Sequence, residues 1–252
     1  MGLVKKWIGE ITVMNDNISR FYHAFNELQD VVAKKMNKSA ETNFGSLLGI
    51  ARLQKDKVIL SYMDSLDFFR EFRNLLIHKT ISGEEAIATP SSLLIEEIEM
   101  ITEKIKHPKK VKDLFLSEVV TFDQGDKLSL VLKKVKEKSY SQFPVFNDNK
   151  LVGIVSENGI TNFLANSISE DFISIKDITI EEVLGAHEEK RLYEVINENK
   201  SIFDIESIFN KRIKEGKTAY VLLISKNQHI KSPTDIVGIM TPWDIPEIVK
   251  NK

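Results

Sequence analysis

The sequence predicts an α plus α/β protein, in which an N-terminal helical bundle precedes two copies of a β-α-β-β-α unit. Three observations support this fold class. Proline is absent until Pro90 while apolar residues recur at helical spacing, a basic proline-containing segment follows at 104–113, and the same order of strand and helix signals then occurs twice.

The helical part is predicted from apolar periodicity. One helix is expected around residues 18–32, where aromatic and aliphatic residues recur every three or four positions. A second helix is expected over 57–79, and a third over Leu93–Ile105, which Pro90-Ser-Ser would begin. Helices joined by connections of this length form a bundle.

The segment 104–113, KIKHPKKVKD, reads as a linker because a proline lies among basic residues. A solvated connector is the simple interpretation, and a patch that attracts phosphate is the alternative. The expected domains are therefore 1–107 for the bundle, 108–170 for the first α/β copy and 171–252 for the second.

Composition excludes several classes of protein. The chain has 252 residues, a net charge of −2 and no cysteine, which excludes disulfides and thiolate zinc sites. The apolar run 219–224 is far too short to cross a membrane, no glycine-rich phosphate loop is present, and the histidines do not have metal-ligand spacing. We expect a cytoplasmic protein without membrane contact and without a metal.

Each α/β copy is read from short β-branched runs and intervening helices. In the first copy, a strand begins near 118, a helix covers 129–139, two strands span 141–156 around an Asn-Asp-Asn turn, and a helix follows at 157–168. The second copy repeats this order from 191 to 252. A unit this small cannot bury its own sheet, so the copies should pack face to face.

The last strand of the second copy leads into a helix through Thr241-Pro-Trp-Asp244. Thr241 can cap that helix, Pro242 suits its first position and Asp244 suits a capping-box carboxylate. A helix start at Asp244 is the alternative. On this reading the residues only begin a helix.

The repeated unit, with LVGIVS and IVGIMTPWD at its last turn, resembles the CBS domain, named after cystathionine β-synthase. The resemblance covers residues 111–250 and implies a tandem pair, or Bateman module, that binds a regulatory adenine nucleotide. It implies that the Thr241 hydroxyl contacts phosphate at the helix start, that Asp244 binds the ribose hydroxyls, and that Gly238 and strand backbone, including Val195, complete the site. Stacking of Tyr220 on the adenine is one interpretation, and a tyrosine in the core of the sheet is the alternative. The ligand is left open among AMP, ADP, ATP, a dinucleotide and S-adenosylmethionine.

The two copies match this family unevenly. The first has Ser156 at the hydroxyl position but Gly159 where a ribose would need a carboxylate. It keeps Phe143-Pro-Val145, whereas the second copy has Ala219-Tyr-Val221. We therefore expect one good nucleotide site and one weakened or empty site.

The segment FREFRNLLIHK, residues 69–79, raises a separate question. At about 100° per residue, Phe68, Phe69 and Phe72 share one helix face with Leu75 and Leu76, which predicts the core side. Arg70, Arg73, Asn74, Ile77 and His78 fall on the opposite face. An isoleucine in the middle of a polar face predicts contact with a partner subunit, so we expect a homodimer.

Arg73-Asn-Leu-Leu-Ile-His78 resembles the Arg-x4–6-His signature of HEPN domains. Many HEPN proteins are metal-independent ribonucleases that act as dimers, and others only bind. The resemblance makes Arg73, Asn74 and His78 the candidate catalytic residues and RNA a candidate partner. Arginine can hold a phosphate in two hydrogen bonds, and histidine can relay a proton near neutral pH. The local alternative is a solvated helix end.

These observations combine into one expected function, in which an adenine-nucleotide-sensing CBS pair controls a HEPN-like domain. Whether that domain is a metal-independent endoribonuclease is left open. The alternative is a non-catalytic nucleotide-binding regulator, whose helical domain mediates dimerisation or docks a partner. A third interpretation is a structural dimer with a vestigial site.

Overall fold

The computed structural model describes residues 2–78, 80–81, 85–86, 88–138, 140–168, 174–185 and 192–252. The side chains of residues 2–15, 77–78, 80–81, 85–86 and 138 lie outside this description. Contacts divide the chain into a helical unit, residues 1–109 with Lys252, and an α/β unit, residues 110–251. The expected boundary between 170 and 171 falls outside the described residues.

The helical unit contains five α-helices and one short hairpin within its described residues. The helices are α1 Gly2–Lys35, α2 Phe44–Gln54, α3 Lys57–Ser61, α4 Met63–His78 and α5 Ser92–Lys106, and the hairpin strands are β1 Thr80–Ile81 and β2 Glu85–Ala86. The helical character is confirmed. The helix predicted over 57–79 was wrong as a single element, because it breaks at Tyr62 into α3 and α4.

Local capping explains several helix ends. Ser91 accepts a hydrogen bond from the N–H of Leu94 and starts α5, as Pro90-Ser-Ser predicted. Helix α2 was not predicted, although Asn43 begins it by accepting from the N–H groups of Gly45 and Ser46. Its signal is a good cap followed by weak apolar periodicity.

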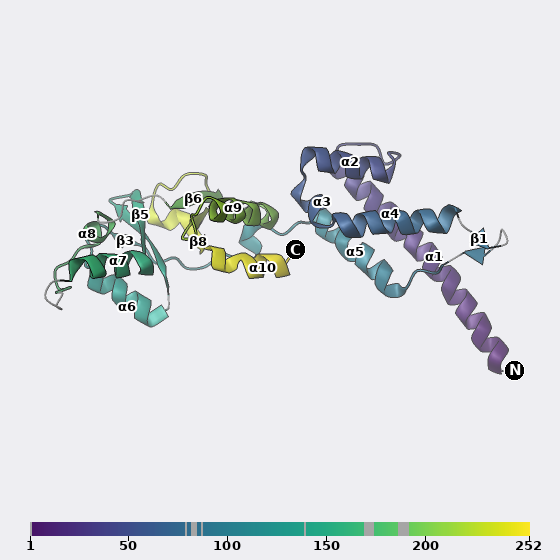
Figure 1. Ribbon diagram of the computed structural model, residues 1–252, viewed down its shortest axis with the longest axis horizontal. Coiled ribbons are helices and arrows are strands. Elements are labelled where there is room, and N and C mark those ends of the chain that lie inside the picture. The colour runs from purple at the N-terminus through teal and green to yellow at the C-terminus, as the bar shows by residue number, and fades with distance from the viewer. Residues whose placement is uncertain are drawn as a thin grey trace. The chain divides into compact units, whose positions relative to one another are not determined.

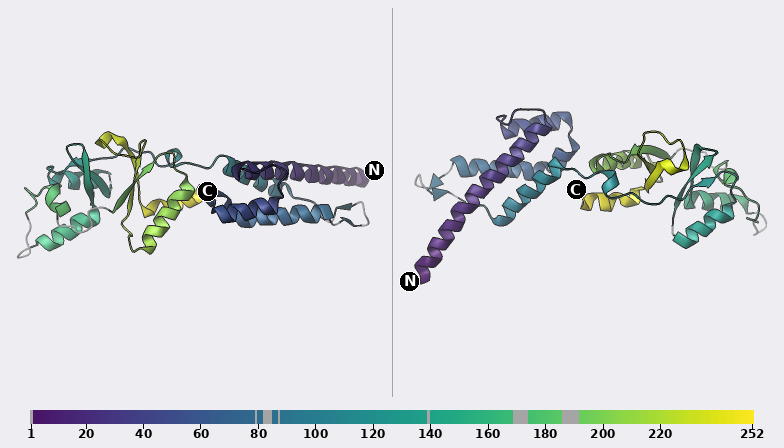
Figure 2. Two further views of the ribbon diagram at one scale, coloured as in Figure 1. Left: turned by 90° about the horizontal axis from the view of Figure 1, so that it is seen from above. Right: turned by 180° about the vertical axis from the view of Figure 1, so that it is seen from behind.

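The helices of this unit pack in two layers, with α1 and α5 in one and α2 and α4 in the other (Figure 2). Aromatic side chains join the layers. The ring centroids of Phe21 and Phe72 lie 5.3 Å apart, and those of Phe25 and Phe44 lie 5.0 Å apart. Phe21, Phe25 and Phe44 are buried, so α1 supplies the centre of this core.

Helix α4 is rotated relative to the face predicted from its sequence. Leu66 and Phe69 are fully buried, but Phe68, predicted on the core side, is 52% exposed. Arg73 was predicted on the face away from the core, yet it is half-buried with its guanidinium 5.8 Å from the centre of the Phe25 ring. Both predictions were wrong because the wheel alone cannot say which part of a wide apolar face meets α1.

The α/β unit has the predicted β-α-β-β-α order in both copies (Figure 1). The first copy contains β3 Phe122–Asp123, α6 Leu128–Lys138, β4 Gln142–Asn147, β5 Lys150–Ser156 and α7 Glu157–Ser167. The second contains β6 Tyr193–Asn197, α9 Ile202–Lys214, β7 Val221–Ser225, β8 Ile236–Met240 and α10 Ile245–Lys250. In each three-stranded sheet, the first pair of strands is parallel and the second is antiparallel.

Each copy forms hydrogen bonds with the segment that precedes the other copy in the chain. The N–H groups of Val111 and Lys112 bond to the carbonyls of Lys200 and Glu198, and that of Ser117 bonds to Val237, so the start of the unit joins the second copy. In return, the N–H of Leu128 bonds to the carbonyl of Ile178, and Ile180 bonds to Asp126. This segment ends in an unpredicted helix, α8 Ile180–Gly185. The exchange binds the two copies together.

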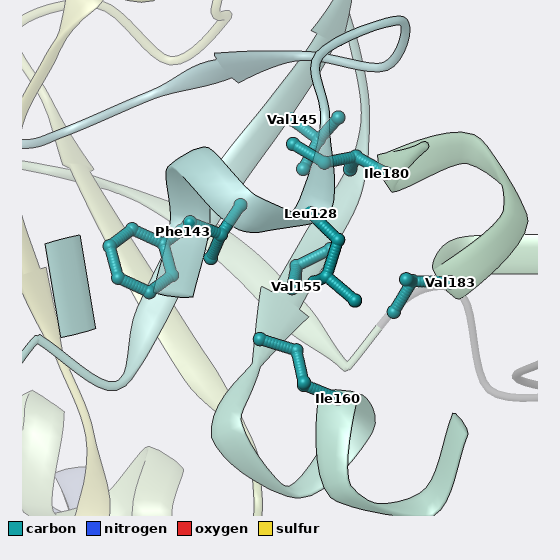
Figure 3. Close-up of a cluster of buried hydrophobic side chains, with 8 residues drawn as sticks. Leu128, Phe143, Val145, Val155, Ile160, Ile180 and Val183 are labelled. Atoms are coloured by element: carbon teal, nitrogen blue, oxygen red, sulfur yellow. The ribbon is translucent and has the colours of Figure 1, made fainter. Parts of the chain in front are cut away.

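Two apolar clusters stabilise the unit. In the first copy, side chains of α6, α7 and α8 pack on one face of the sheet around Leu128, Phe143 and Val155 (Figure 3). The second cluster joins the copies, because Phe146 of β4 packs with Val221 and Leu223 of β7. The face-to-face packing predicted from the small size of each copy is confirmed.

No helix in the described part of the chain is long and apolar enough to cross a membrane. Within the same residues, no cluster of three or more His, Asp or Glu side chains could hold a metal ion.

Candidate ligand-binding site

The end of strand β8 turns into the last helix through residues Thr241 to Asp244. Pro242–Asp244 form a short 3-10 turn, η3, that leads into α10. The Asp244 Oδ2 atom accepts a hydrogen bond of 2.7 Å from the Thr241 N–H and one of 3.4 Å from its hydroxyl. The capping-box role expected of Asp244 is confirmed at the 3-10 turn, and α10 itself begins at the alternative start, with Asp244 as its N-cap.

A second Ser/Thr-Pro-x-Asp turn lies just before β8 and provides a comparison. There Asp235 Oδ2 accepts from two backbone N–H groups, Lys231 at 2.8 Å and Ser232 at 3.0 Å. These bonds lower the pKa of Asp235, with the Lys231 N–H as the main cause. The two turns share a sequence pattern and a capping geometry, but their carboxylates differ in hydrogen-bond donors and in burial.

Asp244 accepts fewer backbone hydrogen bonds than Asp235 and is more deeply buried. It accepts from one backbone N–H, and loss of solvent raises its pKa more than the Thr241 bonds lower it. Both of its hydrogen bonds to described residues fall on Oδ2. A carboxylate has about four lone-pair positions for acceptance, so Oδ1 is available to donors such as a pair of hydroxyl groups.

Two hollows meet at Thr241. One, of about 230 Å³, is lined by the following residues: Ser117, Glu118, Val119, Val120, Tyr140, Ser141, Gln142, Ile239 and Thr241. The other, of about 390 Å³, is lined by Ser141, Gln142, Glu157, Asn158, Thr218, Ala219, Tyr220, Thr241, Pro242 and Trp243. Ser141, Gln142 and Thr241 belong to both, so the hollows adjoin. The larger one has the size of a small-molecule site.

The wall opposite Thr241 comes from the first copy, which the sequence reasoning missed. Residues 117–120, Ser141 and the first residue of β4, Gln142, line the smaller hollow together with Ile239 and Thr241. The exchange of leading segments brings these residues together, since the N–H of Ser117 bonds to the carbonyl of Val237 in β8. A turn pattern read within one copy cannot indicate a wall that the other copy supplies.

Of the other residues expected at the nucleotide site, Tyr220 lines the larger hollow. Its hydroxyl lies 3.4 Å from Glu194 Oε2, and the Arg212 guanidinium lies 4.7 Å from its ring centre. Arg212 also pairs with Glu194 at 3.2 Å. Burial, and next the Glu194 charge, raise the pKa of Tyr220. The ring is therefore held in one orientation.

Val195 in β6 and Gly238 in β8 belong to the sheet of the second copy. A Cβ at Gly238 would lie 2.4 Å from the Phe115 carbonyl oxygen, so the glycine permits close approach of the leading segment. Val195 lies in β6, paired with Leu223, and is half-buried. Neither lines the two hollows described above.

The corresponding turn of the first copy lacks a carboxylate. The Ser156 hydroxyl accepts from the Gly159 N–H at 3.0 Å and caps α7. Gly159 is buried at the position equivalent to Asp244. The turn therefore begins a helix but offers no acceptor for a diol.

The residues of the Arg-x4-His segment all lie on α4. The Arg73 guanidinium is 3.4 Å from Asn74 Oδ1 and stacks near Phe25. Asn74 is exposed, and His78 is the last residue of the helix. The side chains of Ile77 and His78 lie outside the described residues, so the geometry of the Arg–His pair remains a sequence-based prediction.

The first copy is similar to a known protein domain. Residues 111–166 match the model of the CBS domain. The chain contains a CBS domain. The second copy repeats the strand order and pairing of this CBS domain, as described above.

Over 143 residues, 57% of its length, the chain is 27% identical to protein MJ1232 of Methanocaldococcus jannaschii. The match spans 40% of that relative. Two solved structures align over 57% of the chain. A CBS-domain-containing protein of Kribbella flavida has 12% identity, a TM-score of 0.41 and 99% of its chain covered. The CBS domain pair of protein MJ0100, crystallised with 5′-methylthioadenosine and S-adenosyl-L-methionine, has 18% identity, a TM-score of 0.39 and 98% covered.

Proposed function

We propose that the chain is a cytoplasmic homodimer in which a CBS pair binds an adenosine-containing ligand at Thr241 and thereby controls the helical domain. The observation that carries the proposal is Asp244, a partly desolvated carboxylate with spare acceptor capacity that is hydrogen-bonded to Thr241, which lines both hollows. CBS pairs use this turn for an adenosine ligand, and the chain retains its hydroxyl and its carboxylate there.

Asp244 would bind the ribose. A 2′,3′-diol presents two donors that a carboxylate can accept together, and such charge-assisted bonds are stronger than neutral ones. The diol would supply the donors that Asp235 obtains from two backbone N–H groups. Binding would then offset the desolvation that raises the pKa of Asp244.

The adenine would lie against the first copy. Val119 and Val120 are half-buried and line the smaller hollow with Ile239, which provides apolar contact for a flat ring. Ser141 and Gln142 offer polar groups at its edge. Tyr220, fixed by Glu194 and Arg212, bounds the far side of the larger hollow.

One site per chain follows from the unequal turns. The first copy has Gly159 in place of a carboxylate, and its Ser156 hydroxyl already accepts the Gly159 N–H. Calorimetry with adenosine ligands tests the proposal, and we expect a stoichiometry near one. Two equal sites per chain would contradict it, and so would the absence of binding by every adenosine ligand.

For the helical domain, we propose a HEPN-like bundle that dimerises through α4. In the catalytic form, Arg73 holds the scissile phosphate and His78 relays a proton as an RNA 2′-hydroxyl attacks. In the non-catalytic form, the bundle docks a partner and cleaves nothing. The position of Arg73 favours the second, because its side chain is half-buried against Phe25 and serves packing.

Incubation of the purified chain with labelled RNA, with and without ligand, separates the two forms. Cleavage that responds to an adenosine ligand supports a regulated ribonuclease. Ligand-dependent melting without cleavage supports the docking function. An unchanged melting temperature with every ligand would leave only a structural dimer.

A further inference from the structure

The charges around the two hollows indicate which adenosine ligand they accept. Among the described lining residues, the charged side chains are Glu118 and Glu157, and no lysine or arginine is present. Both glutamates are exposed. The nearby Asp244 adds a third carboxylate.

Two backbone N–H groups at the helix starts near the hollows already donate to protein acceptors. The Thr241 N–H, at the start of the last helical segment, donates to Asp244. At the other side of the larger hollow, α7 begins with Glu157 in its first turn, and the Ser156 hydroxyl accepts from Gly159. Each helix start that faces the hollow therefore carries its own carboxylate, which occupies the favourable position for an anion.

A polyphosphate would meet repulsion from the carboxylates that line these hollows. Phosphate groups in proteins are held by arginine or lysine, by metal ions or by clusters of free N–H groups. Lys134 is paired with Glu137 at 2.8 Å. The pKa of Lys134 is raised mainly by this hydrogen bond and less by the charge of Glu118. The described walls thus offer hydroxyl, amide and carboxylate groups instead.

We infer that the ligand is an adenosine whose 5′ substituent is neutral or cationic, rather than a nucleoside di- or triphosphate. This inference rests on the proposed function, which requires only an adenosine ligand. In this case the Thr241 hydroxyl forms a hydrogen bond with an uncharged group of the ligand instead of the phosphate expected from the sequence. A cationic 5′ substituent would be stabilised by Glu157 across the larger hollow.

The test is calorimetry on the full chain with five ligands: adenosine, 5′-methylthioadenosine, S-adenosylmethionine, ADP and ATP. We expect the first three to bind at least tenfold more tightly than ADP and ATP. Glu157→Lys should strengthen ATP binding and weaken S-adenosylmethionine binding. Glu181→Lys changes an exposed residue of α8 that lines neither hollow, makes the same change in net charge and should leave both affinities unchanged.

The outcomes separate the two proposals. If ADP or ATP binds as tightly as adenosine and loses affinity in Asp244→Ala, the inference is wrong and the proposed function stands. If none of the five ligands binds, the proposed function fails and the inference falls with it. An effect of Glu181→Lys equal to that of Glu157→Lys would mean that net charge, rather than the lining of the hollow, sets the preference.

Discussion

The Asp244 carboxylate accepts a 2.7 Å hydrogen bond from the backbone N–H of Thr241, three residues before it. The same relationship exists nine residues earlier between Asp235 and Ser232, at 3.0 Å. Burial raises the pKa of Asp244, whereas hydrogen bonds lower that of Asp235. Two turns of one pattern thus carry carboxylates in opposite electrostatic conditions, and each is the natural control for the other.

The first prediction concerns ligand affinity. Asp244→Ala should weaken adenosine binding at least tenfold, since a hydrogen bond to a charged group contributes about 1.5–3 kcal/mol and about 1.4 kcal/mol is one decade. In Asp235→Ala, the cap is lost but the hollows are untouched, so affinity should be retained. Calorimetry measures both variants.

A 2′-deoxy ligand extends this test. It should bind the parent more weakly than adenosine does, because one of the two donors to Asp244 is missing. The difference should nearly vanish in Asp244→Ala. A constant difference in parent and variant would place the ribose elsewhere.

The second prediction concerns stability and pH. Because its pKa is raised, the folded state holds the Asp244 proton more tightly than the unfolded state. The free energy of unfolding contributed by this group therefore falls as pH rises from the ordinary carboxyl value through the raised value. Asp244→Asn removes the charge and keeps an acceptor oxygen. We expect it to unfold at an equal or higher temperature than the parent at pH 7, with the difference lost in acid.

Asp235→Asn should behave oppositely in the same melting experiment. The pKa of Asp235 is lowered, so its stabilisation is present above the ordinary carboxyl value and is lost as pH falls through the lowered value. The variant should be less stable than the parent at pH 7. Equal shifts in the two variants would show that the surroundings of the two caps are alike.

The third prediction concerns the exchange of leading segments. Gly238→Ala places a Cβ 2.4 Å from the Phe115 carbonyl oxygen, which belongs to backbone and cannot move freely. We expect a loss of about 1–3 kcal/mol in the free energy of unfolding, as for other overpacked sites. Gly185→Ala, where nothing lies within 4 Å, is the control and should be neutral. Denaturant titration distinguishes the two.

The fourth prediction concerns RNA cleavage. If the helical domain is catalytic, cleavage should survive chelation, leave 2′,3′-cyclic phosphate ends and disappear in His78→Ala and Arg73→Ala. Arg70→Ala removes a neighbouring guanidinium that pairs with Asp67 and should retain cleavage. Since Arg73 also packs on Phe25, its variant must be shown to be folded by circular dichroism. Cleavage by His78→Ala at the parental rate would refute the assignment.

The fifth prediction concerns dimerisation. Ile77→Glu should weaken the dimer in sedimentation, because the sequence places this isoleucine in the middle of a polar face of α4. Phe68→Glu alters an exposed apolar side chain on another face of the same helix and should leave the dimer intact. If only Phe68→Glu dissociates the dimer, the interface lies on the other face.

The sequence by itself determined the two-copy organisation and the order of strands and helices within each copy. Strands and helices of the α/β unit follow from period-two and helical patterns, from the Asn-Asp-Asn turn and from the Thr241 cap, all of which act between near neighbours in the chain. It also identified Thr241 and Asp244 as a cap, and Gly159 as the missing carboxylate. Local hydrogen bonds decide these features, so local sequence predicts them.

Only the tertiary structure decided what surrounds Thr241. Residues 117–120 and 141–142 reach it because each copy exchanges its leading segment with the other, and this pairing depends on contacts between distant residues. The orientation of α4 was decided in the same way. Burying Leu66 and Phe69 against the bundle turned Phe68 outward and brought Arg73 over Phe25, an outcome set by the shape of the neighbouring helices rather than by the pattern of α4 itself.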